Sequence, residues 1–410
     1  RQWRELKAFL EEWTRDGEEG TFKGAVNRYG RLDEFEDKLE VKLRKLIRAR
    51  LDQNALASQN PPVAVTWQEG SPFRGLETFE FKHAPVFFGR TAAIAQAIEN
   101  LRRQTHESER RFLMVTGASG SGKSSLVRAG VLPMLVEPGV IEGIGLWRRA
   151  AMRPGDQADP FMAMADALLD SASLPEIASD GTSKGELAKM LHETPEQALG
   201  LVRGALAQAA ALVHAEDRRV LQGKIEEFET TSKRLEILVP PQARLALLID
   251  QFEEIFSDKV DPSVREHFFE LIDVLSDGGR LFVIATMRSD FIPHCANFPK
   301  LLELTRGDGI LQLGPPSAAE LGQMIRQPAQ AAGLLFEADP KTGETLDETL
   351  RDAAINQPTV LPLLGFCLQE LYDRRMNERI LTLEAYRALG GVEGALAGRA
   401  EAVFGSLSVE

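Results

Sequence analysis

The spacing of apolar residues near the beginning of the chain indicates first a helix and then a break. Between residues 33 and 51 apolar positions follow a helical period and alternate with charges, which predicts one amphipathic helix. These positions are Phe35, Leu39, Leu43, Leu46 and Ile47. The next segment, 53–72, has no period and contains Pro61-Pro62, as is typical of a linker. We therefore expect residues 1–52 to be the C-terminal helical end of an upstream domain.

After this linker, short apolar runs alternate with longer amphipathic segments. The runs that predict strands are Phe112–Thr116, Gly145–Met152, Leu245–Ile249, Leu281–Thr286 and Ile310–Leu313. Strands alternating with helices are typical of an α/β fold with a parallel sheet covered by helices. Residues 73–315 are expected to form this domain. The charge-rich helical stretch from Ala205 to Lys233 is interpreted as a surface helix or an insertion.

The remaining sequence is helical in pattern. Residues 316–380 are expected to form a small helical domain in which Pro328, Pro358 and Pro362 act as helix breakers. Residues 381–410 begin a further helical unit that they do not finish. We therefore expect the sequence to be a piece of a longer protein.

A phosphate-binding motif follows the first predicted strand. The string GASGSGKS, Gly117 to Ser124, fits G-x-x-x-x-G-K-[ST] between an apolar strand and a helical stretch, the context in which this motif is meaningful. Its glycines let backbone N–H groups turn inward around a phosphate at a helix N-terminus, where a flexible glycine turn is the alternative. Lys123 is expected to reach the β- and γ-phosphates, and the Ser124 hydroxyl to ligate Mg²⁺. The residues expected to hold the nucleotide here are Gly117, Ser119, Gly120, Ser121, Gly122, Lys123, Ser124 and Ser125.

Carboxylates follow the third predicted strand. Leu245–Ile249 ends in Asp250, and Glu253 and Glu254 come shortly after it. A P-loop needs an acidic partner for its metal at the end of a neighbouring strand, so Asp250 is expected to hold Mg²⁺ directly or through water. Glu253 or Glu254 is a candidate to orient or deprotonate the attacking water. The alternative is an ordinary buried strand that ends in an acidic turn.

Three further segments are candidates for the same site. Arg288 follows the fourth strand, and a planar fork of donors suits phosphate oxygens, so it is expected to sense the γ-phosphate unless it is a surface arginine. Phe88-Gly89-Arg90 and Pro362 lie in two segments that either enclose the base or serve packing alone.

Composition limits the choice of ligands and partners. The 410 residues hold 48 Lys and Arg against 61 Asp and Glu, a net charge of −13, which disfavours a nonspecific grip on nucleic acid. The sequence has only two cysteines and no apolar leader, which predicts a cytoplasmic protein. It has no run near ~18 apolar residues, so no membrane span is expected. The Asn-Lys-x-Asp string of guanine-specific proteins is missing. ATP or ADP with Mg²⁺ is therefore the expected ligand, and no other metal is expected.

In this order, the motifs resemble a known family. The strings that carry the resemblance are FGR from Phe88, GASGSGKS, LALLIDQFEEIF, ATMRSDF and LPLLGFCLQELY. They are similar to the bacterial branch of the STAND-class NTPases, relatives of the NACHT and apoptotic ATPases, over roughly residues 71–408. The resemblance implies that the Arg288 strand separates the P-loop strand from the Asp250 strand. It also implies adenine near Phe88-Gly89-Arg90, with Pro362 closing over it.

The resemblance carries expectations about domains and partners as well. It implies that residues 316–380 are a lid and that residues 381–410 start a winged-helix domain. Members of the family are usually signal-transducing ATPases with an effector before the NTPase domain and a sensing region after it, many of them acting in defence or regulation. Self-association into an oligomer after a protein or small-molecule trigger is thus expected. Residues 21–51 are similar to the closing helix of a small TIR-like domain.

Three functions remain open from the sequence. The first is an ATP-operated switch that is closed with ADP and assembled with ATP, with slow hydrolysis as the reset. The second is a motor or loader ATPase acting on nucleic acid, against which the charge of −13 weighs. The third is a small-molecule phosphotransferase, which the helical domain after the sheet disfavours because it is typical of a hinged lid.

Overall fold

The structure is a computed structural model of the 410-residue chain. It describes residues 66–107, 110–137, 139–221, 241–355 and 360–395. Apart from 317–319, the described residues belong to one compact unit, which contains the sheet and the candidate site. The helix predicted at 33–51, and with it the TIR-like similarity, lies outside the described residues.

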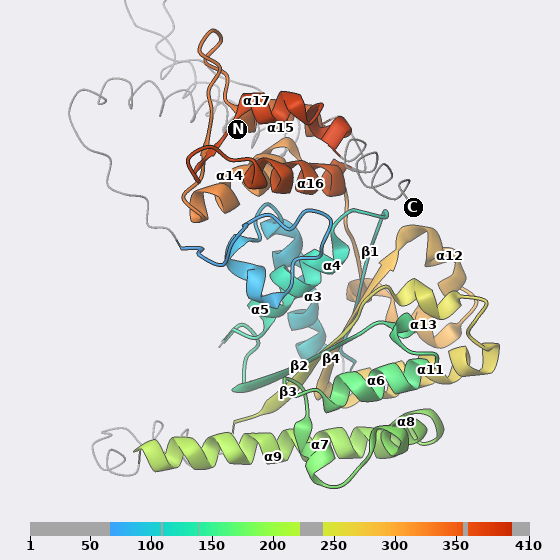
Figure 1. Cartoon of the computed structure of the whole chain (residues 1–410). Helices are drawn as coiled ribbons and strands as arrows, with labels where there is room; N and C mark the ends of the chain where they lie inside the picture. Colours follow the sequence, from blue (N-terminus) through green and yellow to red (C-terminus); the bar gives the residue numbers. More distant parts are fainter. Residues whose placement is uncertain (1–65, 108–109, 138, 222–240, 356–359, 396–410) are drawn as a thin grey trace, which may run out of the picture. The chain divides into compact units, whose positions relative to one another are not determined.

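A five-stranded parallel sheet with the strand order β2-β3-β4-β1-β5 forms the centre of the described part (Figure 1). The strands are β1 (Phe112–Gly117), β2 (Leu146–Met152), β3 (Ala243–Ile249), β4 (Leu281–Arg288) and β5 (Ile310–Gln312). Each coincides with a predicted strand to within two residues at either end. The predicted α/β fold and its parallel sheet are confirmed.

The order of the strands brings the three motifs to one edge. β4 pairs with β1 on one side and with β3 on the other, as the resemblance implied. In register, Gly117 of β1 faces Arg288 of β4, and Ile249 of β3 faces Ala285. Because all strands are parallel, the residues that follow them meet at the carboxyl edge of the sheet, where α/β proteins bind ligands.

Helices cover both faces of the sheet, so its central strands are buried along most of their length. In β1 the side chains of Phe112 and Met114 pack into one core, and those of Leu113 and Val115 into the other, as the alternation of a strand requires. One face carries α6 (Pro160–Leu169), α7 (Pro175–Ser179), α8 (Lys184–Glu193), α9 (Pro195–Leu221) and α11 (Pro262–Ser276). The other carries α3 (Thr91–Glu107) and the P-loop helix, which runs through α4 (Lys123–Ser125), the π-helical η2 (Leu126–Val131) and α5 (Leu132–Leu135).

Local sequence explains where several of these helices begin. Asp159 and Asp261 each accept a hydrogen bond from the backbone two residues on, and a proline occupies the first helical position after each of them. Ser183 forms a reciprocal capping box with Glu186 at the start of α8. Such caps satisfy backbone N–H groups that have no partner inside the helix. The shorter helices are η1 (Phe81–Val86), η3 (Pro154–Asp156), η5 (Phe252–Phe256), η6 (Asp277–Gly279), η7 (Ser289–Phe291), α12 (Ile292–Cys295), α13 (Pro299–Leu304) and η8 (Gly307–Gly309).

The long helix between β2 and β3 differs from its prediction. α9 begins at Pro195, ten residues before the predicted start, and its first half contributes Val202 and Leu206 to the core under the sheet. Within the predicted stretch, Ala205, Leu206, Ala209 and Ala210 are buried while residues 207, 208, 211 and 212 are exposed, as in a surface helix with one face in the core, and residues 222–233 lie outside the described residues. Among the described helices, Pro195–Ala215 is long and apolar enough to cross a membrane, but 39% of that window is buried inside the protein. One face of this helix packs against the core that contains β3.

A second, helical core follows β5. It is formed by α14 (Ala318–Ala331), α15 (Leu346–Ile355), α16 (Val360–Asp373) and α17 (Leu383–Ala388), with β6 (Leu335–Phe336) paired to β7 (Ile380–Leu381). Two of the predicted helix breakers lie inside helices, which corrects the prediction. Pro328 lies within α14, and Pro362 lies in the first turn of α16, where its missing N–H leaves no helical bond unmade. Pro358 lies outside the described residues.

The predicted domain boundaries do not all separate cores. Leu381, Leu383 and Leu389 pack into the same helical core as α14 to α16, so no new core begins at residue 381 in the described part. At the other end, Phe73 also belongs to the helical core, and Trp67 is buried although it was assigned to the linker. The proposed winged-helix segment beyond residue 395 lies outside the described residues.

Candidate nucleotide-binding site

The phosphate loop is closed by its own lysine. Gly120 and Gly122 have φ angles of 73° and 85°, values in the left-handed region that favour glycine. Between the strand and the helix, the ammonium of Lys123 donates to Gly117 O at 3.1 Å and to Ala118 O at 2.8 Å. An ammonium has three donors, so one remains for a ligand. The loop thus has the backbone conformation that the motif predicted.

The loop lies at the start of the P-loop helix, which supplies a partial positive charge. Ser119 and Gly120 are exposed, whereas the Ser121 hydroxyl is buried and has no hydrogen-bond partner among the described residues. Burial lowers the pKa of Lys123 from its ordinary value, while Glu253 and Asp250 oppose that change. A cationic lysine with a spare donor, at a helix N-terminus, fits a phosphate group.

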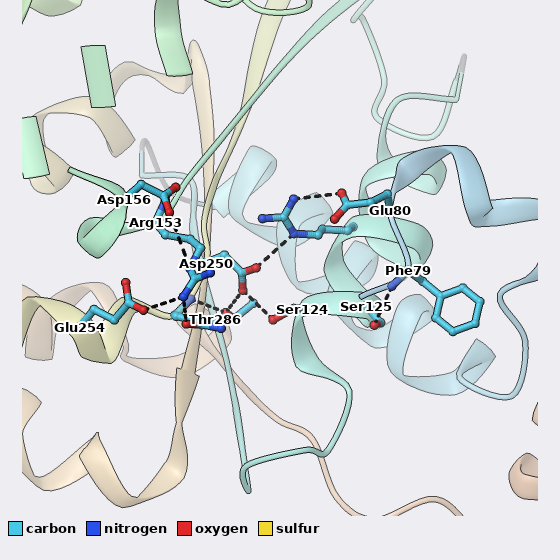
Figure 2. A network of polar contacts seen from close by, with 11 residues as sticks. Phe79, Glu80, Ser124, Ser125, Arg153, Asp156, Asp250, Glu254 and Thr286 are labelled. Atoms are coloured by element: carbon cyan, nitrogen blue, oxygen red, sulfur yellow. Dashed lines mark hydrogen bonds and ion pairs between the residues drawn. The ribbon is translucent and has the colours of Figure 1, made fainter. Parts of the chain in front are cut away.

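Asp250 is the centre of a network of polar contacts at the carboxyl edge of the sheet (Figure 2). Its Oδ1 accepts hydrogen bonds from Ser124 Oγ at 2.7 Å and from Thr286 Oγ1 at 2.6 Å. The guanidinium of Arg128 contacts its Oδ2 at 3.1 Å. Two hydroxyls and a carboxylate are hard oxygen donors of the kind that Mg²⁺ takes. The structure therefore brings the predicted pair, Ser124 and Asp250, into contact.

The two glutamates after Asp250 face different surroundings. Glu253 lines the cavity beside the phosphate loop, and its Oε2 accepts from the backbone N–H of Arg288 at 3.2 Å. Glu254 turns toward the end of β2, where it binds Arg153 at 2.8 Å and the N–H of Gly155 at 2.9 Å. Only Glu253 is placed to act on a group in the cavity, and Glu254 holds the edge of the sheet together.

Arg288 lies at the rim of the cavity. Its side chain is 44% exposed and forms two contacts with Asp290, Nε–Oδ1 at 3.1 Å and Nη2–Oδ2 at 2.6 Å. Hydrogen bonding to Asp290 raises the pKa of Arg288 above its usual range. To bind a phosphate oxygen, Arg288 would have to give up a contact with the carboxylate of Asp290.

Arg90 forms a hydrogen bond with the backbone of the phosphate loop. Its side chain is buried and donates to Ser121 O at 3.3 Å and to Gly314 O at 3.2 Å. Burial lowers its pKa, and nearby Glu320 opposes the change. Phe88 and Arg90 both line the cavity, and Gly89 links them with a φ angle of 79°. The side chain of Arg90 therefore positions the phosphate loop.

The start of α16 lies over the phosphate loop. A Cβ added at Gly120 would come within 3.0 Å of Pro362 Cγ. The cavity between them has a volume of about 310 Å³. Apolar side chains make up much of its lining. They are Val86, Phe87, Phe88, Met324, Leu364 and Leu368, and polar residues such as Arg74 and Glu77 also line it. An apolar cavity next to a phosphate loop fits an aromatic base.

Three contributors to the site were missed from the sequence. Arg128 and Thr286 both hold Asp250, and the segment 74–79 forms one wall of the cavity. Position 128 is the fourth residue after Ser124, one helical turn further along the P-loop helix. That spacing brings the two side chains to one face of the helix, and it was the available signal for Arg128. No motif marks the cavity wall.

One comparison with known proteins decides the family. A family model described as Novel STAND NTPase 1 matches residues 72–410. The chain belongs to this family. The resemblance of its motifs to STAND-class P-loop NTPases is thereby confirmed. No curated protein sequence matches this STAND NTPase.

Solved structures with a similar arrangement include three proteins. They are the ORC1 protein of Aeropyrum pernix in complex with DNA (16% identity, TM-score 0.43, 75% of this chain and 66% of that chain), the ORC2 protein of the same organism with ADPNP and ADP (13%, 0.41, 74% and 64%) and Cdc6p from Pyrobaculum aerophilum (14%, 0.40, 74% and 63%). This STAND NTPase spans less than two thirds of each of them. Such distant similarity does not bear on what this chain binds.

Proposed function

We propose that this chain is the ATP-binding and slowly hydrolysing switch of a signal-transducing protein. The observation that carries the proposal is the shared cavity, lined by the phosphate loop and Arg288 of the sheet region and by Pro362 of the helical region. A nucleotide in it would contact both regions. A ligand shifts a conformational equilibrium by its differential affinity for the two states, so ADP and ATP would favour different arrangements of these regions.

The residues have separable roles in this proposal. Lys123 and the N–H groups of the phosphate loop would hold the phosphates, and Ser124 and Asp250 would hold Mg²⁺, which neutralises charge on the phosphate oxygens when bound. Glu253 would orient or deprotonate a water molecule beside the loop. Arg288 would leave Asp290 for the γ-phosphate, and this would distinguish ATP from ADP.

Assembly and setting belong to the same proposal. Moving a two-state equilibrium from 1:99 to 99:1 requires about 5.5 kcal/mol of differential binding, more than one new arginine contact supplies, so contacts between subunits would add the rest. We infer a cytoplasmic protein that self-associates when a protein or small-molecule trigger is sensed and that activates an upstream effector, with bacterial antiviral defence or regulation as the setting. The net charge of −13 argues against the motor on nucleic acid.

Thermal unfolding combined with the mass in solution tests this function. ATP with Mg²⁺ at ~100 times its Kd should stabilise the wild type by about 2.7 kcal/mol through mass action, GTP should do so less, and Lys123→Ala should lose the effect. With ATP the mass should rise in the presence of the trigger, and Arg288→Ala should bind ATP without assembling. Equal effects of ATP and GTP, or an ATP effect that survives in Lys123→Ala, would reject the ATP site. Normal turnover with an unchanged mass in every state would reject the switch.

A further inference from the structure

The segment 66–90, here called the strap, is anchored in the helical region at its beginning. The N–H groups of Thr66 and Trp67 both donate to Ala331 O at the end of α14, at 2.9 and 3.0 Å. Phe73 is 3% exposed and packs into the helical core. Further along, a Cβ at Gly365 of α16 would come within 2.7 Å of the backbone oxygen of Gly75. The strap therefore lies directly against the helices that cover the cavity.

The same strap is bound to the P-loop helix a few residues later. The N–H of Phe79 donates to Ser125 Oγ at 3.1 Å, and Glu80 Oε2 accepts from Arg128 Nη1 at 3.0 Å. Ser125 and Arg128 are three positions apart and share one face of the helix. In Figure 2, Phe79 and Glu80 of the strap lie on the same side of Asp250 as Ser124 and Ser125.

Arg128 connects this contact to the metal-binding candidates. One edge of its guanidinium holds Glu80 of the strap, and its Nε holds Asp250 Oδ2 at 3.1 Å. The Arg128 side chain is 19% exposed and that of Asp250 is 5% exposed, so water screens this pair weakly. A single guanidinium thus joins a carboxylate of the strap to the carboxylate at the centre of the site.

We propose that Arg128 is a positioning residue that couples occupancy of the metal site at Asp250 to the attachment of the strap through Glu80. This rests on the Mg²⁺–nucleotide site of the proposed function. The positive charge of Arg128 beside Asp250 opposes the arrival of a second cation, and the negative charge of Glu80 offsets that opposition. Glu80 therefore favours metal binding. Because coupling between two sites is reciprocal, metal binding strengthens the attachment of the strap.

The consequence reaches beyond the cavity. The strap follows residues 1–65 directly in the chain and touches both the helical region and the P-loop helix. A change in its attachment to the P-loop helix can therefore also affect its contacts with the helical region.

A double-mutant cycle tests the coupling, with the Mg²⁺-dependence of ATP affinity measured by titration. Glu80→Gln should weaken Mg²⁺-dependent binding about fivefold or more, the lower end of usual coupling energies. In the Arg128→Gln background the same change should have no effect. Glu69→Gln, which removes a charge from an exposed position of the strap, is the matched control and should leave the affinity unchanged. An equal loss from Glu80→Gln in both backgrounds would overturn the proposal.

A second readout follows the strap itself. Hydrogen exchange of peptides that cover Glu80 to His83 should slow when Mg²⁺ and ATP are added to the wild type, and should slow less in Arg128→Gln. Arg128→Lys keeps the charge but lacks the planar fork that holds two carboxylates, so the effect of Glu80→Gln should be smaller in it than in the wild type, and it replaces Arg128→Gln if that variant fails to fold. If the wild type binds no ATP with Mg²⁺, the proposed function and the coupling both fall. If it binds but the cycle is additive, only the coupling falls.

Discussion

The phosphate loop and the strap line the same cavity, but they are held in place in opposite ways. The loop is fixed mainly by its own residues, because Lys123 bonds back to Gly117 O and Ala118 O. The strap has one short helix, η1, and is fixed by partners far away in sequence, among them Ser125 and Ala331. The conformation of the loop thus depends largely on its own motif, and Arg90 at the end of the strap adds a hydrogen bond to Ser121 O. The strap forms only when both regions of the fold are in place.

The largest expected effect tests whether the strap is part of the fold. Phe73→Ala removes a buried ring from the helical core and should lower the free energy of unfolding by about 3–5 kcal/mol, as other buried Phe→Ala changes do. Denaturant unfolding measures it. Leu76→Ala, at a position 58% exposed in the same segment, is the control and should change the value by less than about 0.5 kcal/mol. A Phe73→Ala protein as stable as the control would show that the strap is a loose linker, and the comparison would fail.

The next effect sharpens the distinction between binding groups and supporting groups within one motif. Glu253→Gln should slow ATP hydrolysis by about 10²-fold with little change in ATP affinity, because a positioned base matters only for the reaction. Glu254→Gln should slow it less than tenfold, and should cost at most about 1 kcal/mol of stability, because the contacts of Glu254 with Arg153 and Gly155 are partly exposed to water.

Steady-state hydrolysis and nucleotide titration of both glutamine variants separate these roles. Each variant serves as the control for the other, since the two differ by one position in the chain. The reverse order of rates would assign the base to Glu254 and would mean that its contacts with β2 break when nucleotide binds.

The sequence predicted the loop, Asp250 and the strand edges because these depend on local patterns. Strand alternation and a short apolar run define β1 and β3, and parallel pairing then places the residues after them together. The position of Arg288 opposite Gly117 depends in addition on the pairing of β4 with β1. The interposition of β4 between β1 and β3 did not follow from any local pattern and came from the family resemblance.

The sequence did not reveal features that tertiary contacts decide. Residues 66–72 have a linker's composition. The burial of Trp67 and its hydrogen bond to Ala331 O make the beginning of this segment a part of the fold. Pro362 is a helix breaker by type, but in the first turn of α16 it needs no N–H bond. Glu253 and Glu254 could not be separated, because the orientation of η5 against β2 decides which of them faces the cavity.

The smallest effect uses pH to test the strap. His83 is buried in the strap, and its Nδ1 accepts from the N–H of Glu80 at 2.8 Å. Burial lowers the pKa of His83 below 6.5, with Arg74 and Lys82 adding to the change, so at mildly acid pH the folded protein binds fewer protons there than the unfolded chain. The stability from this histidine is therefore complete above pH 6.5 and is lost as the pH falls through the folded-state pKa. Denaturant unfolding of the wild type and of His83→Gln between pH 8 and 5 should show the difference between them shrinking toward acid pH, with the other histidines common to both proteins. If the difference in unfolding free energy stays constant or grows toward acid pH, the neutral imidazole does not stabilise the strap. The hydrogen bond between His83 and Glu80 would then not contribute to its attachment.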